Sequence, residues 1–398
     1  MEYKAYKIAD LIDEIAMGPF GSNIKVDCFV DEGIPVLNGS NLDGFALSEK
    51  SFRYVTPEKA DSLKKANASR GDVVITHRGT LGQIAYIPQN SKHDRYVISQ
   101  SQFRVRCNEK ILPEYMVYYF HTALGRHKLL SNSSQVGVPA LARPSSTFQQ
   151  IEIEVPSVQE QRRVISIINA LQAKIDCNNK INDNLYAQAK AIFDNHFINI
   201  DAIPAGWRKG NLLDIANYLN GLAMQKFRPQ GHEIGLPVLK IKELRQGSCD
   251  DSSELCSLSI KPEYIIHNGD VVFSWSGSLL VDIWCGGTCG LNQHLFKVTS
   301  DVYDKWFYYL WTAHHLARFI AIAADKATTM GHIKREELAK AEVLIPCEED
   351  YTSFNSIMQP IFELIISNRI ESRKLAALRD ELLPKLMTGE IDVSDVQL

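Results

Sequence analysis

The chain contains an internal repeat, and each copy is large enough to fold as a domain. A segment from Ile34 to Phe148 returns in the same order between Leu236 and Ile333. The clearest matches are Ile34-Pro-Val-Leu with Leu236-Pro-Val-Leu, and Arg70-Gly-Asp-Val-Val-Ile with Asn268-Gly-Asp-Val-Val-Phe. Each copy exceeds the roughly 20–50 residues of a solenoid unit and can bury a core of its own. The sequence therefore predicts two similar but non-identical domains.

A long helical segment follows each copy of the repeat. Apolar residues recur there at alternating steps of four and three, in residues 164–196 and again in residues 354–386. This spacing is typical of a coiled-coil seam. Polar residues interrupt both seams at the same point: Asn178 and Asn182 in the first helix, Asn368 and Ser372 in the second. Because polar seam positions fix register, we expect the helices to pair antiparallel with these residues close together. The alternative is two amphipathic helices packed on separate domains.

These signals predict an α+β fold in which two pseudo-repeated mixed α/β domains are joined by two long antiparallel coiled-coil helices. The expected segments are a first domain (1–156), a helix (157–198), a second domain (199–346), a second helix (347–388) and a C-terminal tail (389–398). From residue 164 to residue 196 a helix rises roughly 48 Å. One turn of B-DNA is about 34–36 Å. Domains at the two ends of such a rod would lie a little over one turn apart.

Composition places the chain among globular proteins of a reducing compartment. Its hydrophobic content of 45% and charged content of 23% are typical of such proteins. Its apolar runs are shorter than the roughly 18 residues that span a bilayer. Residues 1–7 lack the apolar stretch of a signal peptide, and the eight cysteines are scattered, which favours reduced thiols. We therefore expect a cytoplasmic protein without a membrane partner.

The charge distribution differs between the two halves. The net charge of −4 argues against a non-specific nucleic-acid coat but permits sequence-specific binding through a local patch. Residues 66–145 hold ten Lys and Arg against four acids, whereas the equivalent part of the second half is close to neutral. The basic stretch indicates a nucleic-acid surface in the first half. The alternative is a solvated surface whose acids lie elsewhere in the chain.

Motifs for catalysis or cofactor binding are missing. The chain has no phosphate loop, dinucleotide-binding glycine motif, zinc-protease helix or nucleophile elbow, and no Asn/Asp-Pro-Pro-aromatic motif of adenine methyltransferases. The best metal candidate is Cys249, Cys256, Cys285 and Cys289 with His294 nearby, but their spacing differs from the usual zinc pairs. We therefore predict no catalytic residue, no metal and no cofactor, and buried or free thiols.

Polar residues gather in loops that follow predicted strands. Residues 76–83 offer Arg78 for guanine and Gln83 for adenine, with glycines that allow close backbone approach. The candidate DNA contacts of the first half are Ser22, Asn23, Lys25, Asn38, Ser40, Asn41, His77, Arg78, Thr80, Gln83, Gln100 and Gln102. Those of the second half are Gln225, Lys226, Lys240, Lys242, Ser274, Trp275, Ser276, Ser278, Gln293 and His294. The same glycines and hydroxyls also fit ordinary turns.

Over nearly its whole length the chain resembles the specificity subunits of type I restriction-modification enzymes. Besides the two half-repeats, the resemblance rests on Met17-Gly-Pro-Phe-Gly-Ser-Asn-Ile24, Pro156-Ser-Val-Gln-Glu-Gln-Arg163, Asn178-Asn-Lys-Ile-Asn-Asp-Asn-Leu185 and Leu382-Leu-Pro-Lys-Leu-Met-Thr-Gly-Glu-Ile391. The second half departs from the pattern, with Gly221-Leu-Ala-Met-Gln-Lys226 and Cys347-Glu-Glu-Asp350 at the corresponding places.

The resemblance implies a non-catalytic subunit with two target-recognition domains, each reading one half of an asymmetric double-stranded DNA site. It also implies that the helices set the gap and hold methyltransferase subunits, of which we expect two. Whether endonuclease subunits join, which bases are read and how long the gap is stay open. One alternative is a coiled-coil scaffold that joins two protein-binding modules without DNA contact. Another is an enzyme with a cysteine metal site in its second half.

Overall fold

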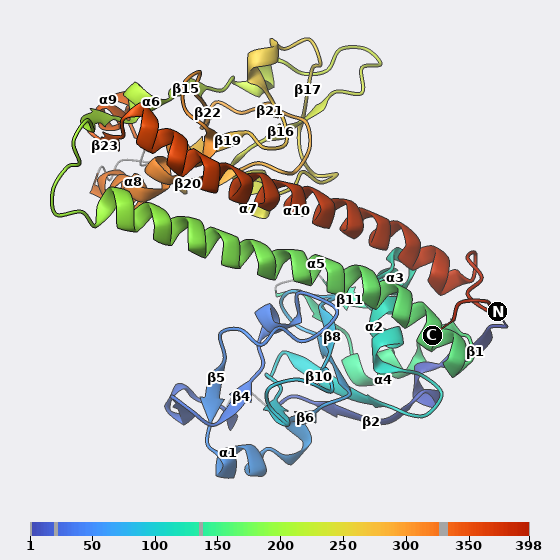
Figure 1. Cartoon of the computed structure of the whole chain (residues 1–398). Helices are drawn as coiled ribbons and strands as arrows, with labels where there is room; N and C mark the ends of the chain where they lie inside the picture. The colour runs from blue at the N-terminus through green and yellow to red at the C-terminus, as the bar shows by residue number, and fades with distance from the viewer. Residues whose placement is uncertain (1, 20–22, 135–137, 326–332, 398) are drawn as a thin grey trace. The chain divides into compact units, whose positions relative to one another are not determined.

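The computed structural model describes residues 2–19, 23–134, 138–325 and 333–397 (Figure 1). They form two compact units, residues 1–172 with 377–398 and residues 173–376. Each unit holds one copy of the repeat and a part of each long helix, α5 (Val158–Phe193) and α10 (Glu348–Thr388). We call residues 2–156 domain 1 and residues 199–346 domain 2.

Two sheets form the framework of domain 1. A four-stranded antiparallel sheet has the order β2-β10-β7-β8, and a five-stranded sheet has the order β3-β5-β4-β9-β6, with β4 and β9 parallel. The strands are β1 (Lys4–Lys7), β2 (Ile12–Met17), β3 (Phe29–Val30), β4 (Ile34–Val36), β5 (Arg53–Val55), β6 (Asn67–Ser69), β7 (Asp72–Thr76), β8 (Ile84–Tyr86), β9 (Arg95–Val97), β10 (Gln102–Cys107), β11 (Ser133–Ser134), β12 (Ala140–Leu141) and β13 (Glu152–Val155). The helices are α1 (Pro57–Ser62), α2 (Pro113–His121), α3 (Ala123–Leu130) and α4 (Pro144–Gln150).

Domain 2 is built on two four-stranded sheets, with the orders β15-β22-β19-β20 and β17-β16-β21-β18. The strands are β14 (Arg208–Asn211), β15 (Asn217–Asn220), β16 (Leu236–Leu239), β17 (Leu255–Cys256), β18 (Ile265–Ile266), β19 (Val271–Ser274), β20 (Leu280–Ile283), β21 (Cys289–Leu291), β22 (Leu295–Thr299) and β23 (Glu342–Ile345). The helices are α6 (Leu212–Ile215), α7 (Ile241–Gln246), α8 (Lys305–Asp325) and α9 (Arg335–Ala339).

The two domains share one topology, as the repeat predicts. The order β2-β10-β7-β8 matches β15-β22-β19-β20, and β5-β4-β9-β6 matches β17-β16-β21-β18 with a parallel central pair in each. The pair β1 and β13 likewise matches β14 and β23. Among the described residues, domain 1 adds β3 and the β11–β12 pair to the common plan. The predicted α+β class is confirmed.

The repeated Gly-Asp dipeptides form the turns that the sequence predicts before β7 and β19. Gly71 and Gly269 have φ values of 86° and 88°, in the left-handed region that glycine adopts without strain. The carboxylate of Asp72 accepts a hydrogen bond from a backbone N–H three residues earlier (2.9 Å), and that of Asp270 does the same (2.8 Å). Each dipeptide therefore both turns the chain and caps the turn.

Aromatic residues of the predicted helices lie in the cores. Tyr115, Tyr118 and Phe120 of α2 are buried in the main core of domain 1. Trp306 and Phe307 of α8 are buried in the main core of domain 2. An aromatic side chain buries about 150–250 Å² and therefore contributes strongly to a core. These clusters are structural, as the sequence indicates.

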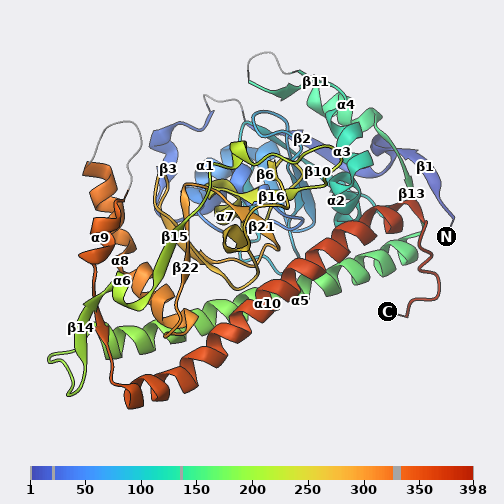
Figure 2. The same ribbon diagram turned by 90° about the horizontal axis from the view of Figure 1, so that it is seen from above.

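Helices α5 and α10 run antiparallel and side by side (Figure 2). Within the second unit, Asn178 Nδ2 donates to Glu371 Oε2 (2.7 Å) and to Ser372 Oγ (3.3 Å). Asn368 Nδ2 donates to Asn182 Oδ1 (2.9 Å). The four polar seam residues thus meet in one layer, where a slip in register would leave buried amides without partners.

No helix in the described part of the chain is long and apolar enough to cross a membrane. All eight cysteines are free thiols.

Candidate nucleic-acid interface

The polar loops of domain 1 come together at one edge of its sheets. Strands β4 and β9 are parallel, so the segments that follow them leave the sheet at the same edge. The loop between β7 and β8 joins them: the backbone N–H of His77 donates to the carbonyl of Ser101 (2.8 Å), and Gln83 Nε2 donates to Asp43 Oδ1 (2.8 Å). We call residues 38–43, 77–83 and 99–102 the domain 1 rim.

Domain 2 assembles the equivalent loops in the same way. The backbone N–H of Trp275 donates to the carbonyl of His294 (3.4 Å), and Ser276 Oγ lies 2.9 Å from Nδ1 of the same histidine. The side chain of Ile241 lies beside Gly277. We call residues 240–242, 275–279 and 292–294 the domain 2 rim.

The two rims share a backbone framework but carry different side chains. Three backbone hydrogen bonds occupy equivalent places: His77 to Ser101 and Trp275 to His294, Gly18 to Gln102 and Gly221 to Leu295, and Leu141 to His77 and Ile333 to Trp275. On this framework Trp275 stands where domain 1 has His77, and Ser276 stands where it has Arg78. One scaffold therefore presents two different sets of hydrogen-bonding and apolar groups.

One glycine in each domain lets the chain pass close to its rim. A Cβ built on Gly18 would lie 1.9 Å from the carbonyl oxygen of Ser99, and one built on Gly221 would lie 2.2 Å from that of Asn292. The sequence already places the segment from Gly221 at the position of the segment from Gly18, but it did not reveal the close backbone approach at these two glycines. The available signal was a glycine directly after β2 and directly after β15.

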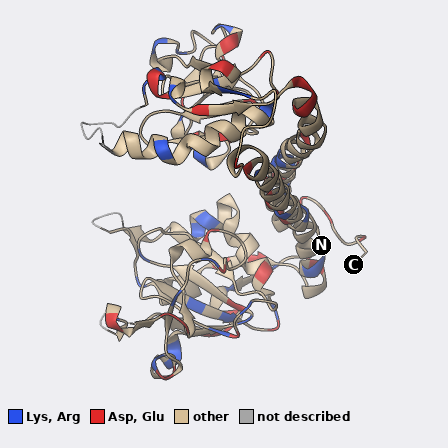
Figure 3. Ribbon diagram, turned by 60° about the vertical axis from the view of Figure 1, so that its left-hand side comes forward, with Lys and Arg blue, Asp and Glu red and all other residues tan. Residues whose placement is uncertain are grey.

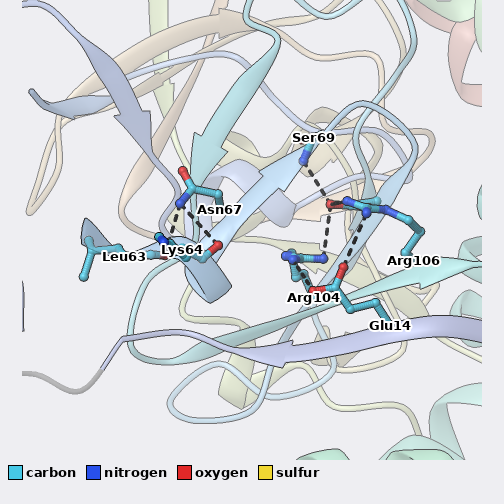
Figure 4. Close-up of polar contacts among 8 residues, drawn as sticks. Glu14, Leu63, Lys64, Asn67, Ser69, Arg104 and Arg106 are labelled. Carbon is cyan, nitrogen blue, oxygen red and sulfur yellow. Dashed lines mark hydrogen bonds and ion pairs between the residues drawn. The ribbon is translucent and has the colours of Figure 1, made fainter. Parts of the chain in front are cut away.

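Four of the ten basic residues in the stretch form ion pairs with described acids of domain 1, where acidic and basic residues are interspersed (Figure 3). The buried carboxylate of Asp72 accepts from Arg106 Nε (2.9 Å) and lies 3.5 Å from Arg104 Nη1. Arg104 Nη2 also pairs with Glu14 (2.7 Å), as Figure 4 shows. Arg70 and Arg95 pair with acids as well. Of the four acids in these pairs, Asp72 and Asp94 belong to the stretch itself, whereas Glu14 and Asp61 come from other segments of domain 1.

Three arginines on the rim side of domain 1 have no such partner. Arg78 is exposed on the β7–β8 loop, where its backbone pairs with Ala140. Arg126 of α3 lies with its guanidinium beside Gly82 of the same loop. Arg143 directly follows the segment of β12 and has a φ of 46°. Within the described ranges none of the three forms an ion pair, so neighbouring acids do not neutralise their charges. We call them the rim arginines.

Comparison with known proteins identifies the family of the chain. The family profile for the "Type I restriction modification DNA specificity domain" matches residues 6–187. The specificity subunit of the type I restriction enzyme MjaIX from Methanocaldococcus jannaschii is 25% identical over 99% of this chain and 95% of its own length. That of HindI from Haemophilus influenzae is 20% identical over 82% of this chain and 88% of its own length. Residues 6–187 therefore belong to the type I restriction-modification DNA specificity domains, and nearly the whole chain is similar to the specificity subunits of these enzymes.

The fold agrees with this assignment. The crystal structure of the specificity subunit from M. genitalium covers 97% of this chain and 96% of its own, with a TM-score of 0.56 at 13% sequence identity. A specificity subunit is the non-catalytic component of a type I enzyme, and this role accounts for the missing catalytic motifs.

The family motif that opens α5 has a structural role in this chain. The buried Gln161 accepts a hydrogen bond from the backbone N–H of Leu112 (2.9 Å), just before α2. In the second half, where the motif is absent, Tyr351 Oη accepts from the backbone N–H of Asp304 (2.7 Å), just before α8. A different side chain of each long helix thus holds the start of the core helix in each half.

The predicted contacts of domain 1 divide by exposure. Asn23, Lys25, Ser40, Arg78, Thr80 and Gln100 are exposed, Asn38, His77 and Gln83 are partly buried, Asn41 and Gln102 are buried, and Ser22 lies outside the described residues. Asn41 Nδ2 donates to the carbonyls of Ser48 and Lys50 (both 2.9 Å), and Gln102 Oε1 accepts from the N–H of Ser99 (2.9 Å). Asn41 and Gln102 therefore support the rim from within.

The predicted contacts of domain 2 are more strongly neutralised. Gln225, Lys226, Lys242 and Ser278 are exposed, Lys240, Trp275, Gln293 and His294 are partly buried, and Ser274 and Ser276 are buried. Lys240 pairs with Glu254, and Lys242 lies 3.4 Å from Asp250. Trp275 Nε1 donates to Asn220 Oδ1 (2.9 Å). The domain 2 rim is therefore polar and aromatic, with little free positive charge.

His77 is held as a neutral ring on the domain 1 rim. Its Nε2 lies 3.2 Å from the carbonyl oxygen of Gln100, and a carbonyl only accepts, so Nε2 carries the proton. Burial lowers the pKa of His77 below its ordinary value of 6.5. At neutral pH the ring thus offers Nδ1 as an acceptor and adds no charge to the rim.

The buried histidines predict a loss of stability on mild acidification. Burial lowers the pKa of His77, His121, His314 and His315 in the folded protein, so the unfolded chain binds more protons once the pH falls below about 6.5. The free energy of unfolding should therefore fall between pH 7.5 and pH 5.5, by at most about 1.4 kcal/mol for each histidine, because pH 5.5 lies about one unit below the unfolded pKa. Urea unfolding at the two pH values measures this. A His121→Gln variant should lose part of the dependence, and equal stability at both pH values would contradict the prediction.

The cysteines weighed as metal ligands pack as apolar groups. Cys256, Cys285 and Cys289 are buried, and Cys249 packs against the same small core as Cys289. The hydrogen bond with Cys249 and burial raise the pKa of the Cys289 thiol. Among the described residues no group of three or more His, Cys, Asp and Glu side chains is placed to hold a metal ion. His294 instead faces Ser276 on the domain 2 rim.

Proposed function

We propose that this specificity subunit reads a split, asymmetric DNA site, with the domain 1 rim on one half and the domain 2 rim on the other. The observation that carries the proposal is the shared backbone framework with different side chains on its two copies. Equal frameworks present loops in equivalent ways, while side chains at base edges determine the sequence that is read. The target-recognition domains are residues 1–156 and 199–346.

The long helices, residues 157–198 and 347–388 in this proposal, set the gap between the half-sites, and residues 389–398 form a C-terminal tail. The polar layer fixes their register, which a spacer of defined length requires. We further propose that they dock two methyltransferase subunits. Ile357 and Leu364 support this, since they lie one heptad apart on α10 and are 51% and 46% exposed. Exposed apolar residues repeated on one helix face are typical of a partner surface.

Mapping of methylated adenine tests whether each domain reads one half of the DNA site. Cells that express this chain with its methyltransferase should methylate a split motif that is absent with the methyltransferase alone. Replacing residues 1–156 by another recognition domain of the family should change one half of the motif and leave the other half and the gap intact. A change in both halves would refute the assignment of one domain to each half. An assembled, competent complex without any motif would favour the scaffold alternative.

A further inference from the structure

Helix α10 contacts domain 2 through a bidentate ion pair between Arg369 and Asp282. Arg369 Nη1 donates to Asp282 Oδ1 (2.8 Å), and Nη2 donates to Asp282 Oδ2 (2.7 Å). The side chains are 29% and 26% exposed, so water screens the pair only partly. Two parallel bonds between a planar guanidinium and a planar carboxylate fix an angle as well as a distance. Asp282 lies on β20, next to the strand that leads into the domain 2 rim.

Around the pair, α10 also contacts domain 2 through apolar side chains: Phe362 packs against Tyr309 (ring centroids 5.7 Å apart), and Ile366 lies beside Gly269. A cavity of about 310 Å³ adjoins the pair, lined among others by Asn182, Tyr186 and Tyr309. The packing of α10 on domain 2 is therefore incomplete beside the pair. Apolar packing is non-directional, so the ion pair is the contact here that fixes an angle.

Domain 2 has a second, firmer attachment near the start of α10. Trp306 Nε1 of α8 donates to Asn355 Oδ1 (2.7 Å), and the surrounding aromatic residues belong to the main core. Asn355 and Arg369 are fourteen residues apart, which is about 21 Å along a helix. A turn of about 10° around the firm attachment would move the Arg369 end by about 3.5 Å. That is close to the roughly 3.4 Å rise of one base pair.

We propose that the Arg369–Asp282 pair holds domain 2 at one angle on the helices and so restricts the enzyme to one gap length. The inference rests on the proposed function, because it concerns the spacing of the two half-sites. Arg369 and Asp282 are positioning residues, since they act through the orientation of the domain 2 rim. The gap is then set by the length of the helices together with the rigidity of this attachment.

The test measures methylation of DNA duplexes whose half-sites are separated by the native gap or by one base pair more or less. Reconstituted complexes carry the wild-type chain, Arg369→Ala, Asp282→Ala or the exchanged pair Arg369→Asp with Asp282→Arg. We expect each single variant to lower the preference for the native gap at least about tenfold, or ~1.4 kcal/mol. The exchanged pair should recover part of that preference, and both half-site sequences should stay as in the wild type.

Lys374→Ala is the matched control, because it removes an exposed cation from the same helix without a described partner. If an alanine variant does not fold, Arg369→Lys replaces it in the test, because lysine keeps the positive charge but cannot form the bidentate ion pair. Single variants that keep the native preference, or lose methylation equally at all three gaps, would overturn the inference. A wild-type complex without any split motif would instead count against the proposed function.

Discussion

Replacing Gly18 by alanine should destabilise the first unit by about 2–4 kcal/mol, or displace the loop after β2 and with it recognition of one half-site. The added Cβ would stand 1.9 Å from the carbonyl oxygen of Ser99 and 2.9 Å from that of Gln102. Both oxygens belong to backbone that other hydrogen bonds hold in place, so neither can yield without cost. The domain 1 rim contains these residues, so a backbone shift here would move the side chains that face DNA.

Urea unfolding followed by far-UV circular dichroism measures the Gly18→Ala effect. Gly44→Ala is the matched control, because its Cβ would meet only the carbonyl oxygen of Ala46 at 3.7 Å. Gly221→Ala makes the equivalent change in domain 2. All five tryptophans lie between residues 207 and 311, so their fluorescence reports on that unit alone. Wild-type stability and an intact methylation motif in both alanine variants would show that the close approach is not needed.

The sequence was sufficient to predict the architecture because the signals for it are periodic and local. The heptad spacing and the Gly-Asp turns depend on residues close to one another in the chain, and the repeat is visible when one half of the sequence is compared with the other. An apolar stripe along a helix predicts a buried face whatever surface packs against it. Both long helices could therefore be predicted from their own residues. The polar layer could be predicted too, because an asparagine buried in a coiled-coil seam can reach a hydrogen-bond partner at only a few positions.

The roles of single rim residues could not be predicted, because they depend on partners far away in sequence. Asn41 and Gln102 are residue types that can contact DNA bases, yet their side-chain amides form hydrogen bonds with the protein backbone. Lys240 is a cation by type, yet Glu254 neutralises it. Counting charges along a stretch of sequence does not show which acidic residue pairs with which basic residue in the fold. The count therefore could not separate the paired arginines from the rim arginines.

Removing the rim arginines should weaken DNA binding by about two orders of magnitude at roughly 0.1 M salt and flatten its salt dependence. Each arginine that neutralises a phosphate releases counterions, so the slope of log K against log salt should fall by about 0.9 for each one lost. The triple variant Arg78→Ala, Arg126→Ala, Arg143→Ala should therefore lose about 2.7 from the slope. Its folding should be unaffected, because the three side chains are exposed and form no ion pair with the described residues.

Fluorescence anisotropy with a DNA duplex carrying the mapped motif, at salt concentrations from about 50 to 200 mM, measures both quantities. Removing Arg95 together with Asp61 is the matched control, because this pair is internally neutral and belongs to the paired set. Lys240→Ala in domain 2 should change the slope little, since its charge is already matched by Glu254. Domain 1 would then supply most of the electrostatic attraction, and domain 2 would add sequence preference through polar and aromatic contacts. An unchanged slope in the triple variant would show that the DNA backbone lies elsewhere on domain 1.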